Sequence, residues 1–96
     1  MDWFKEKVIY ITGGSAGIGR AIAEQCLKHG ASVIITGRNP ENLKRVHKEL
    51  LQISENVLAH EADVSNSDQV TASVDAALEK FGCIDGLVNN APSIHT

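Results

Sequence analysis

The sequence is poor in the residues that build several common kinds of site. Its 96 residues include two cysteines, two prolines, one tryptophan, one tyrosine and two phenylalanines. Cys26 and Cys83 form no repeated spacing, so we predict neither a disulfide framework nor a cysteine-based metal site. The four histidines are scattered, and none stands at ligand spacing from a cysteine or a carboxylate, so we assign no metal. Cys26 follows Ile18 and Ile22 at helical spacing and is expected in the core.

Long apolar runs and a large excess of one charge are also missing. Asp2 and Glu6 interrupt the N-terminus, and the first apolar run is too short for a signal peptide or a membrane span. We therefore expect a cytoplasmic protein with no membrane partner. The net charge of −3, from nine basic and twelve acidic side chains, argues against nonspecific binding of nucleic acid. The composition is that of a globular protein, so residues 1–96 are expected to form a single unit.

Strand and helix patterns alternate along the whole chain. Strands are predicted over residues 8–11, 31–36, 57–62 and 84–88, and helices over 17–29, 40–51 and, after a capping stretch at 65–68, up to 81. Alternation with short connections indicates a parallel sheet with right-handed crossovers. We therefore predict an α/β fold with a Rossmann-like parallel sheet of order 3-2-1-4, which is half of a doubly wound domain.

A glycine-rich turn joins the first predicted strand to the first predicted helix. Gly13, Ser15, Gly17 and Gly19 lie in this turn. The start of a helix offers free N–H groups and the positive end of the helix dipole. Glycine permits the tight turn and leaves the backbone open to a phosphate. The turn therefore predicts a cradle for the pyrophosphate of a dinucleotide.

Three short motifs resemble those of the short-chain dehydrogenase/reductase family. Residues 12–19 read Thr-Gly-Gly-Ser-Ala-Gly-Ile-Gly and resemble the family's T-G-x-x-x-G-I-G motif. Residues 63–64 resemble its Asp-Val pair, which contacts the adenine ring, and residues 89–91 resemble its N-N-A-G motif, with Pro92 in place of the usual glycine. The resemblance implies that the following residues bind the cofactor: Gly13, Ser15, Gly17, Ile18, Gly19, Asp63, Val64, Asn89, Asn90 and Ala91.

One basic residue predicts which dinucleotide is preferred. Arg38 follows the second predicted strand, at the position that faces the adenosine ribose in doubly wound folds. An acidic residue there binds the 2′-hydroxyl of NAD, whereas an arginine accommodates the 2′-phosphate of NADP. Gly37 occupies the usual acidic position, and the pattern resembles NADP-preferring members of the family. We therefore expect Arg38 to bind the cofactor and NADP to be preferred over NAD.

The catalytic residues of the family have no counterpart in this sequence. The family uses a Tyr-x-x-x-Lys motif, a preceding serine and an asparagine on a later helix. Tyr10 is the only tyrosine, and Gly14 stands where the lysine would be required. We assign no catalytic residue. The chain is expected to be the cofactor-binding, N-terminal part of a carbonyl or alcohol oxidoreductase, truncated before the catalytic half and inactive alone.

Two other readings stay open. The chain is alternatively a non-catalytic module that binds a nucleotide, or that dimerises with itself or with a longer family member. The apolar strand over residues 84–88 would lie at a sheet edge and would favour such self-association. Another Rossmann-type protein, such as a methyltransferase, is the second alternative, although Gly37 and Arg38 argue against it. A P-loop is excluded because no G-K-[ST] follows the glycines.

Overall fold

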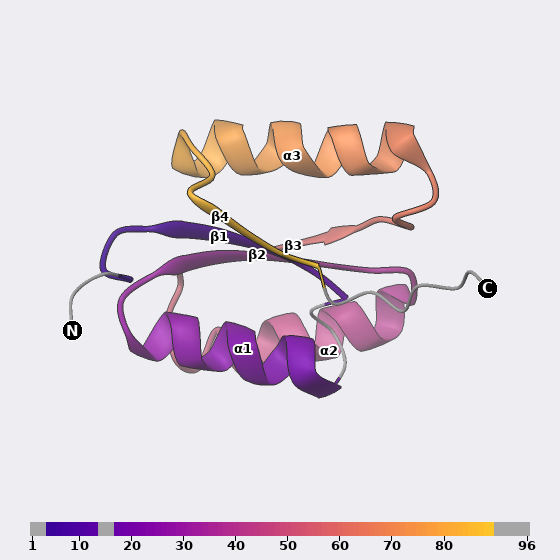
Figure 1. Cartoon of the computed structure of the whole chain (residues 1–96). Helices are drawn as coiled ribbons and strands as arrows, with labels where there is room; N and C mark the ends of the chain where they lie inside the picture. The colour runs from indigo at the N-terminus through magenta and orange to yellow at the C-terminus, as the bar shows by residue number, and fades with distance from the viewer. Residues whose placement is uncertain (1–3, 14–16, 90–96) are drawn as a thin grey trace.

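Strands and helices alternate throughout the computed structural model of the chain, which describes residues 4–13 and 17–89 (Figure 1). Their order confirms the predicted β-α-β-α-β-α-β pattern. The elements are β1 (Val8–Thr12), α1 (Gly17–Lys28), β2 (Ser32–Gly37), α2 (Pro40–Leu50), β3 (Val57–Glu61), α3 (Ser67–Phe81) and β4 (Gly86–Asn89).

The four strands form one parallel sheet with the order β3-β2-β1-β4. In Figure 1, α1 and α2 lie below this sheet and α3 lies above it. The chain moves from β1 to β2 and β3 on one side, and α3 then returns it to β4 on the other side of β1. The predicted fold and strand order are therefore confirmed. The carboxyl ends of β1 and β4 meet at the point where the strand order reverses, which is where doubly wound sheets bind ligands.

The core has two layers because the central strands are buried on both faces. Successive side chains of a strand point to opposite faces. Ile9 and Ile11 thus face α1 and α2, while Val8 and Tyr10 face α3. This two-sided burial explains the continuous apolar runs of β1 and β2. Cys26 on α1 belongs to the core layer between this helix and the sheet, with only 5% of its surface exposed, as predicted.

The helix ends follow the residues that cap them. Asn39 and Asn66 precede α2 and α3, and the side-chain oxygen of each accepts backbone N–H groups of the first helical turn. Gly82 ends α3 in the left-handed conformation, with φ +86°. Gly30 also has positive φ, and α1 ends at Lys28, one residue before the predicted boundary.

All four strands differ from their sequence-based predictions, each by one or two residues at one or both ends. β4 begins at Gly86 rather than at residue 84, because Asp85 binds the start of β1 in a different way. The Asp85 N–H donates to the carbonyl oxygen of Val8 at 2.7 Å, and its carboxylate accepts the Val8 N–H at 2.8 Å. β3 ends at Glu61, although the N–H of Ala62 still donates to the Gly37 carbonyl oxygen at 3.0 Å.

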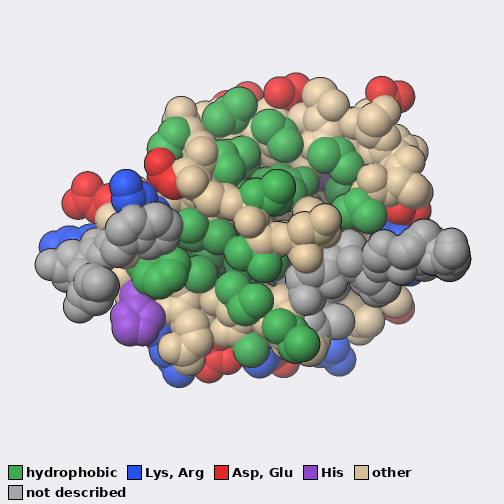
Figure 2. Space-filling view, in the orientation of Figure 1, with side chains coloured by type: hydrophobic (Ala, Val, Ile, Leu, Met, Phe, Trp, Pro, Cys, Tyr) green, Lys and Arg blue, Asp and Glu red, His purple; other side chains and the backbone are tan. Residues whose placement is uncertain are grey.

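β4 is an edge strand of the sheet, as the sequence predicts. Leu87 on this strand is 68% exposed. Figure 2, drawn in the orientation of Figure 1, shows hydrophobic side chains gathered across the face along which β4 runs. Together with α3, β4 borders a groove of about 350 Å³ that includes Val70, Val74 and Leu87. The described chain therefore exposes an apolar surface beside the edge strand of its sheet.

Candidate functional site

The sheet brings four of the predicted site residues to one edge. Gly13 follows β1, Arg38 follows β2, Asp63 lies just beyond β3, and Asn89 is the last residue of β4. Because the strands are parallel, all four positions lie at the carboxyl edge of the sheet. Ligands of open α/β sheets bind outside this edge.

The glycines of the turn leave the start of α1 accessible. Gly17 is the first residue of α1, and its φ of +48° is one that other residues rarely adopt. Among the described residues, no atom lies within 4 Å of a Cβ atom placed on Gly17, its chain neighbours aside. Gly13 also has positive φ, at +70°, and Gly19 is buried in the first turn of the helix. A helix N-terminus can bind a phosphate through its free N–H groups, and the assignment of these glycines to a pyrophosphate stays a prediction.

Some of the predicted residues cannot be placed in this arrangement. Ser15, Asn90 and Ala91 lie outside the described residues. Their assignment to the cofactor stays a prediction.

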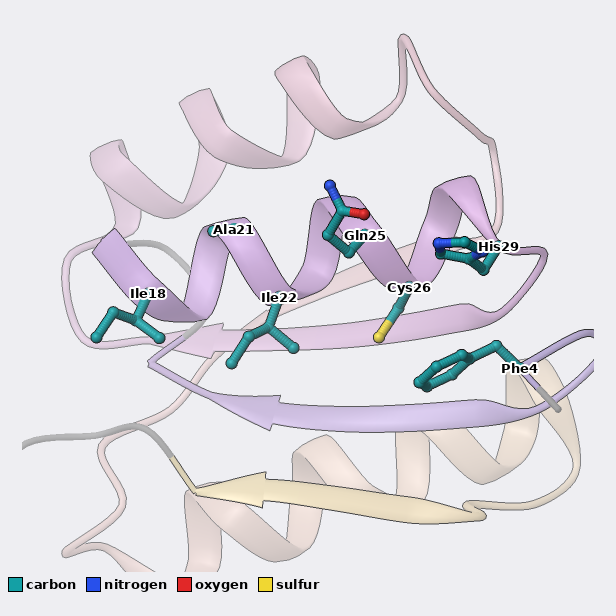
Figure 3. A pocket seen from close by; sticks show the side chains of 7 residues that line it. All are labelled: Phe4, Ile18, Ala21, Ile22, Gln25, Cys26 and His29. Atoms are coloured by element: carbon teal, nitrogen blue, oxygen red, sulfur yellow. The ribbon is translucent and has the colours of Figure 1, made fainter. Parts of the chain in front are cut away.

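Ile18 lines an apolar groove that follows α1 and is bordered by Phe4 (Figure 3). The side chain is 70% exposed and lies at the N-terminal end of the helix. The groove has a volume of about 320 Å³ and follows α1 to His29, with Phe4 on its far wall. Its position along the helix separates most of it from the carboxyl edge of the sheet. The assignment of Ile18 to the cofactor therefore stays a prediction.

Hydrogen bonds to Asp63 hold its carboxylate beside the end of β3. The backbone N–H of Ser65 donates to Asp63 Oδ1 at 2.9 Å, and the Ser65 hydroxyl donates to the same oxygen at 2.7 Å. The Asp63 N–H donates to Gln69 Oε1 at 2.7 Å. The Ser65 hydrogen bonds hold the pKa of Asp63 below its ordinary value, and the charge of Arg38 lowers that pKa further. Asp63 thus also closes a capping turn before α3, and its neighbour Val64 is exposed.

A side-chain hydrogen bond connects the ends of β1 and β4. The Thr12 hydroxyl donates to Asn89 Oδ1 at 3.0 Å. Thr12 is 7% exposed, whereas Asn89 is exposed, so this bond is only partly shielded from water. The bond fixes the Asn89 side chain at the point where the strand order reverses. The sequence identified Thr12 only as part of a motif, and its positioning role depends on the pairing of β1 with β4.

Residues 4–13 and 17–89 contain neither a candidate metal centre nor a helix suited to crossing a membrane. No group of three or more His, Cys, Asp or Glu side chains there is placed to hold a metal ion. No helix in the same ranges combines the length and apolar character needed to cross a membrane.

Comparison with known proteins identifies the family. The family model for short chain dehydrogenases matches residues 7–95. The chain belongs to the short-chain dehydrogenase/reductase family. It is similar to the CLA biosynthesis dehydrogenase/reductase of Lactiplantibacillus plantarum, with 40% identity over 91 residues, which are 95% of this chain and 32% of that protein. The chain therefore spans about a third of the length of this curated relative.

Solved structures of short-chain dehydrogenase/reductases share the fold and differ in their bound cofactors. A 3-ketoacyl-(acyl-carrier-protein) reductase from Brucella melitensis, complexed with NADH, is 40% identical with a TM-score of 0.81, over 88% of this chain and 33% of that one. A metagenomic short-chain oxidoreductase in complex with NADP is 37% identical with a TM-score of 0.82, over 93% of this chain and 40% of that one. Relatives therefore bind both dinucleotides, and the methyltransferase alternative is not favoured.

The pKa of Asp63 provides a direct test of the site geometry. We expect Ser65→Ala to raise this pKa towards its ordinary value of 3.8, because the hydroxyl donor is lost. With a depressed folded-state pKa, the stabilisation from this carboxylate is present above pH 3.8 and is lost as the pH falls through the folded-state value. NMR titration of the side-chain carboxyl carbon measures the shift. Ser67→Ala is the control and should not change it, and a wild-type pKa at or above 3.8 would contradict the geometry.

Proposed function

We propose that this chain is the NADP-binding, N-terminal part of a carbonyl or alcohol oxidoreductase of the short-chain dehydrogenase/reductase family. The observation that carries the proposal is the open space at Gly17, where α1 begins with positive φ. Arg38 and Asp63 lie at the same edge of the sheet as this space. No catalytic residue is assigned, since the sequence holds no Tyr-x-x-x-Lys motif.

In this proposal each part of the edge holds a different part of the dinucleotide. The glycine turn binds the pyrophosphate through backbone N–H groups at the start of α1. Asp63 and Val64 contact the adenine ring, and Asn89, tied to Thr12, lines a ribose. The bound dinucleotide would supply the hydride. The proposed cofactor-binding residues are Gly13, Ser15, Gly17, Ile18, Gly19, Arg38, Asp63, Val64, Asn89, Asn90 and Ala91.

Arg38 is the residue proposed to select NADP. It is exposed directly after β2, so its guanidinium is accessible to a ligand at the carboxyl edge. A guanidinium presents planar N–H donors that match the geometry of a phosphate, and the group stays charged at all working pH values. Gly37 offers no carboxylate to the 2′-hydroxyl of NAD. The combination favours a 2′-phosphate at this position.

Replacement of Arg38 tests this selection. Arg38→Ala should weaken NADPH binding by about 1.5–3 kcal/mol, the usual contribution of a hydrogen bond to a charged group, which is roughly ten- to 150-fold in Kd. NADH affinity should change by less than about twofold. Isothermal calorimetry with both dinucleotides measures the difference, and Arg45→Ala, an exposed arginine within α2, is the control. Equal losses for NADH and NADPH would rule out the selective role.

The exposed β4 edge favours self-association as a second role of the chain. Gly86 and its neighbours present unpaired backbone groups on one side, and Leu87 adds an exposed apolar side chain. Edges of this kind recruit further strands unless charges or prolines block them. The occupant of the edge in this proposal is another copy of the chain or a longer family member.

Sedimentation at several protein concentrations tests the self-association. The wild type should form larger species as the concentration rises, and Leu87→Lys should shift the distribution towards monomer because a buried lysine is costly at a strand pair. Leu51→Lys is the matched control, since Leu51 is exposed at the end of α2, on the other side of the sheet. A monomer at every concentration would contradict this role.

A further inference from the structure

The register between β2 and β3 places an acidic residue beside Gly37. Gly37 pairs with Glu61, and the N–H of the next residue, Ala62, donates to the Gly37 carbonyl oxygen. Side chains alternate between faces along a strand. Glu61 therefore shares a face with Val57, which packs in the core layer between the sheet and α2. Neighbouring strands lie about 4.8 Å apart. The Glu61 side chain therefore stands next to Gly37, which has no side chain of its own.

Glu61 adds a negative charge near the proposed binding position of the 2′-phosphate. The residue is exposed, and within the described part of the chain it makes no ion pair. Glu49, in contrast, pairs with Arg20 at 2.8 Å. Arg38 directly follows Gly37 and lies close enough to the β3 end to act on Asp63. The edge beyond β2 and β3 thus combines one cation with two carboxylates.

We propose that Glu61 limits the preference for NADP that Arg38 provides. The inference rests on the proposed cofactor site. The Glu61 carboxylate repels the 2′-phosphate of NADP and has no comparable effect on the neutral 2′-hydroxyl of NAD. Because the site is open to water, the repulsion is screened and is expected to be moderate. In this proposal Glu61 on β3 takes over part of the effect of the acidic residue that NAD-preferring proteins carry at the position of Gly37.

Electrostatic repulsion differs measurably from a structural role of Glu61. A structural defect in β3 would lower the affinity for both dinucleotides and would not depend on salt. Repulsion changes the affinity for NADPH more than that for NADH, because only NADPH carries the 2′-phosphate, and salt screens it because the Debye length falls from about 10 Å at 0.1 M to about 3 Å at 1 M. Glu61→Gln keeps the size of the side chain and removes only its charge.

Titration of the 96-residue chain with NADPH and NADH tests the inference by calorimetry. Glu61→Gln should tighten NADPH binding by about three- to tenfold at low salt and change NADH binding by less than about twofold. At about 0.5 M salt, the increase in NADPH affinity caused by Glu61→Gln should fall towards the small change seen with NADH. Glu55→Gln is the control, because Glu55 is an exposed carboxylate just before β3, at the opposite end of the strand.

The outcomes separate this inference from the proposed function. Unchanged NADPH affinity in Glu61→Gln would overturn it. Equal changes for NADH and NADPH, or an equal gain in Glu55→Gln, would overturn it as well. A wild-type chain that binds neither dinucleotide would contradict the proposed function itself, and the inference would fall with it.

Discussion

Parallel pairing of β1 with a strand on each side is the constraint on which the site depends. β2 pairs on one side and β4 on the other. Asn89, the last residue of β4, pairs with Thr12, and β2 continues two residues past Ile35, the partner of Ile11, to Gly37. Everything placed beyond these ends, from the glycine turn to Arg38 and Asn89, inherits its position from that register. The Thr12–Asn89 hydrogen bond reinforces the pairing where the strand order reverses. A one-residue slip would turn the side chains of a strand to the other face.

Burial on both faces keeps this register in place. Ile11 and Ile34 lie on opposite faces of the sheet, and each is completely buried. Full burial of such a side chain contributes about 1.5–3 kcal/mol relative to exposure. The outer strands are less protected, since β4 ends the sheet and its Leu87 is exposed. Burial therefore stabilises the strand pairing most at β1 and β2, next to the start of α1.

Local signals in the sequence were sufficient for the elements and their caps. The apolar runs predicted β1 and β2, and Asn39 and Gly82 predicted helix ends, because each of these features depends on a few neighbouring residues. The start of β4 was predicted two residues early, since the role of Asp85 depends on its bonds to Val8, which is distant in sequence.

Features that form between strands were beyond the reach of sequence patterns. The placement of Glu61 beside Gly37 follows from the register of β2 with β3, and no motif contains both residues. The grooves along α1 and between α3 and β4 likewise arise from packing. The motif residues of the turn were identified from sequence because glycine is required by the backbone itself.

The central claim is that the open space at Gly17 receives the pyrophosphate. Gly17→Ala and Gly82→Ala form a matched pair, because both glycines have positive φ and neither has an atom within 4 Å of its Cβ position. Each substitution should destabilise the fold by a similar amount, about 1–2 kcal/mol. Calorimetric titration with NADPH should show at least a roughly tenfold weaker Kd for Gly17→Ala alone. Equal affinities of folded Gly17→Ala and Gly82→Ala would contradict the account.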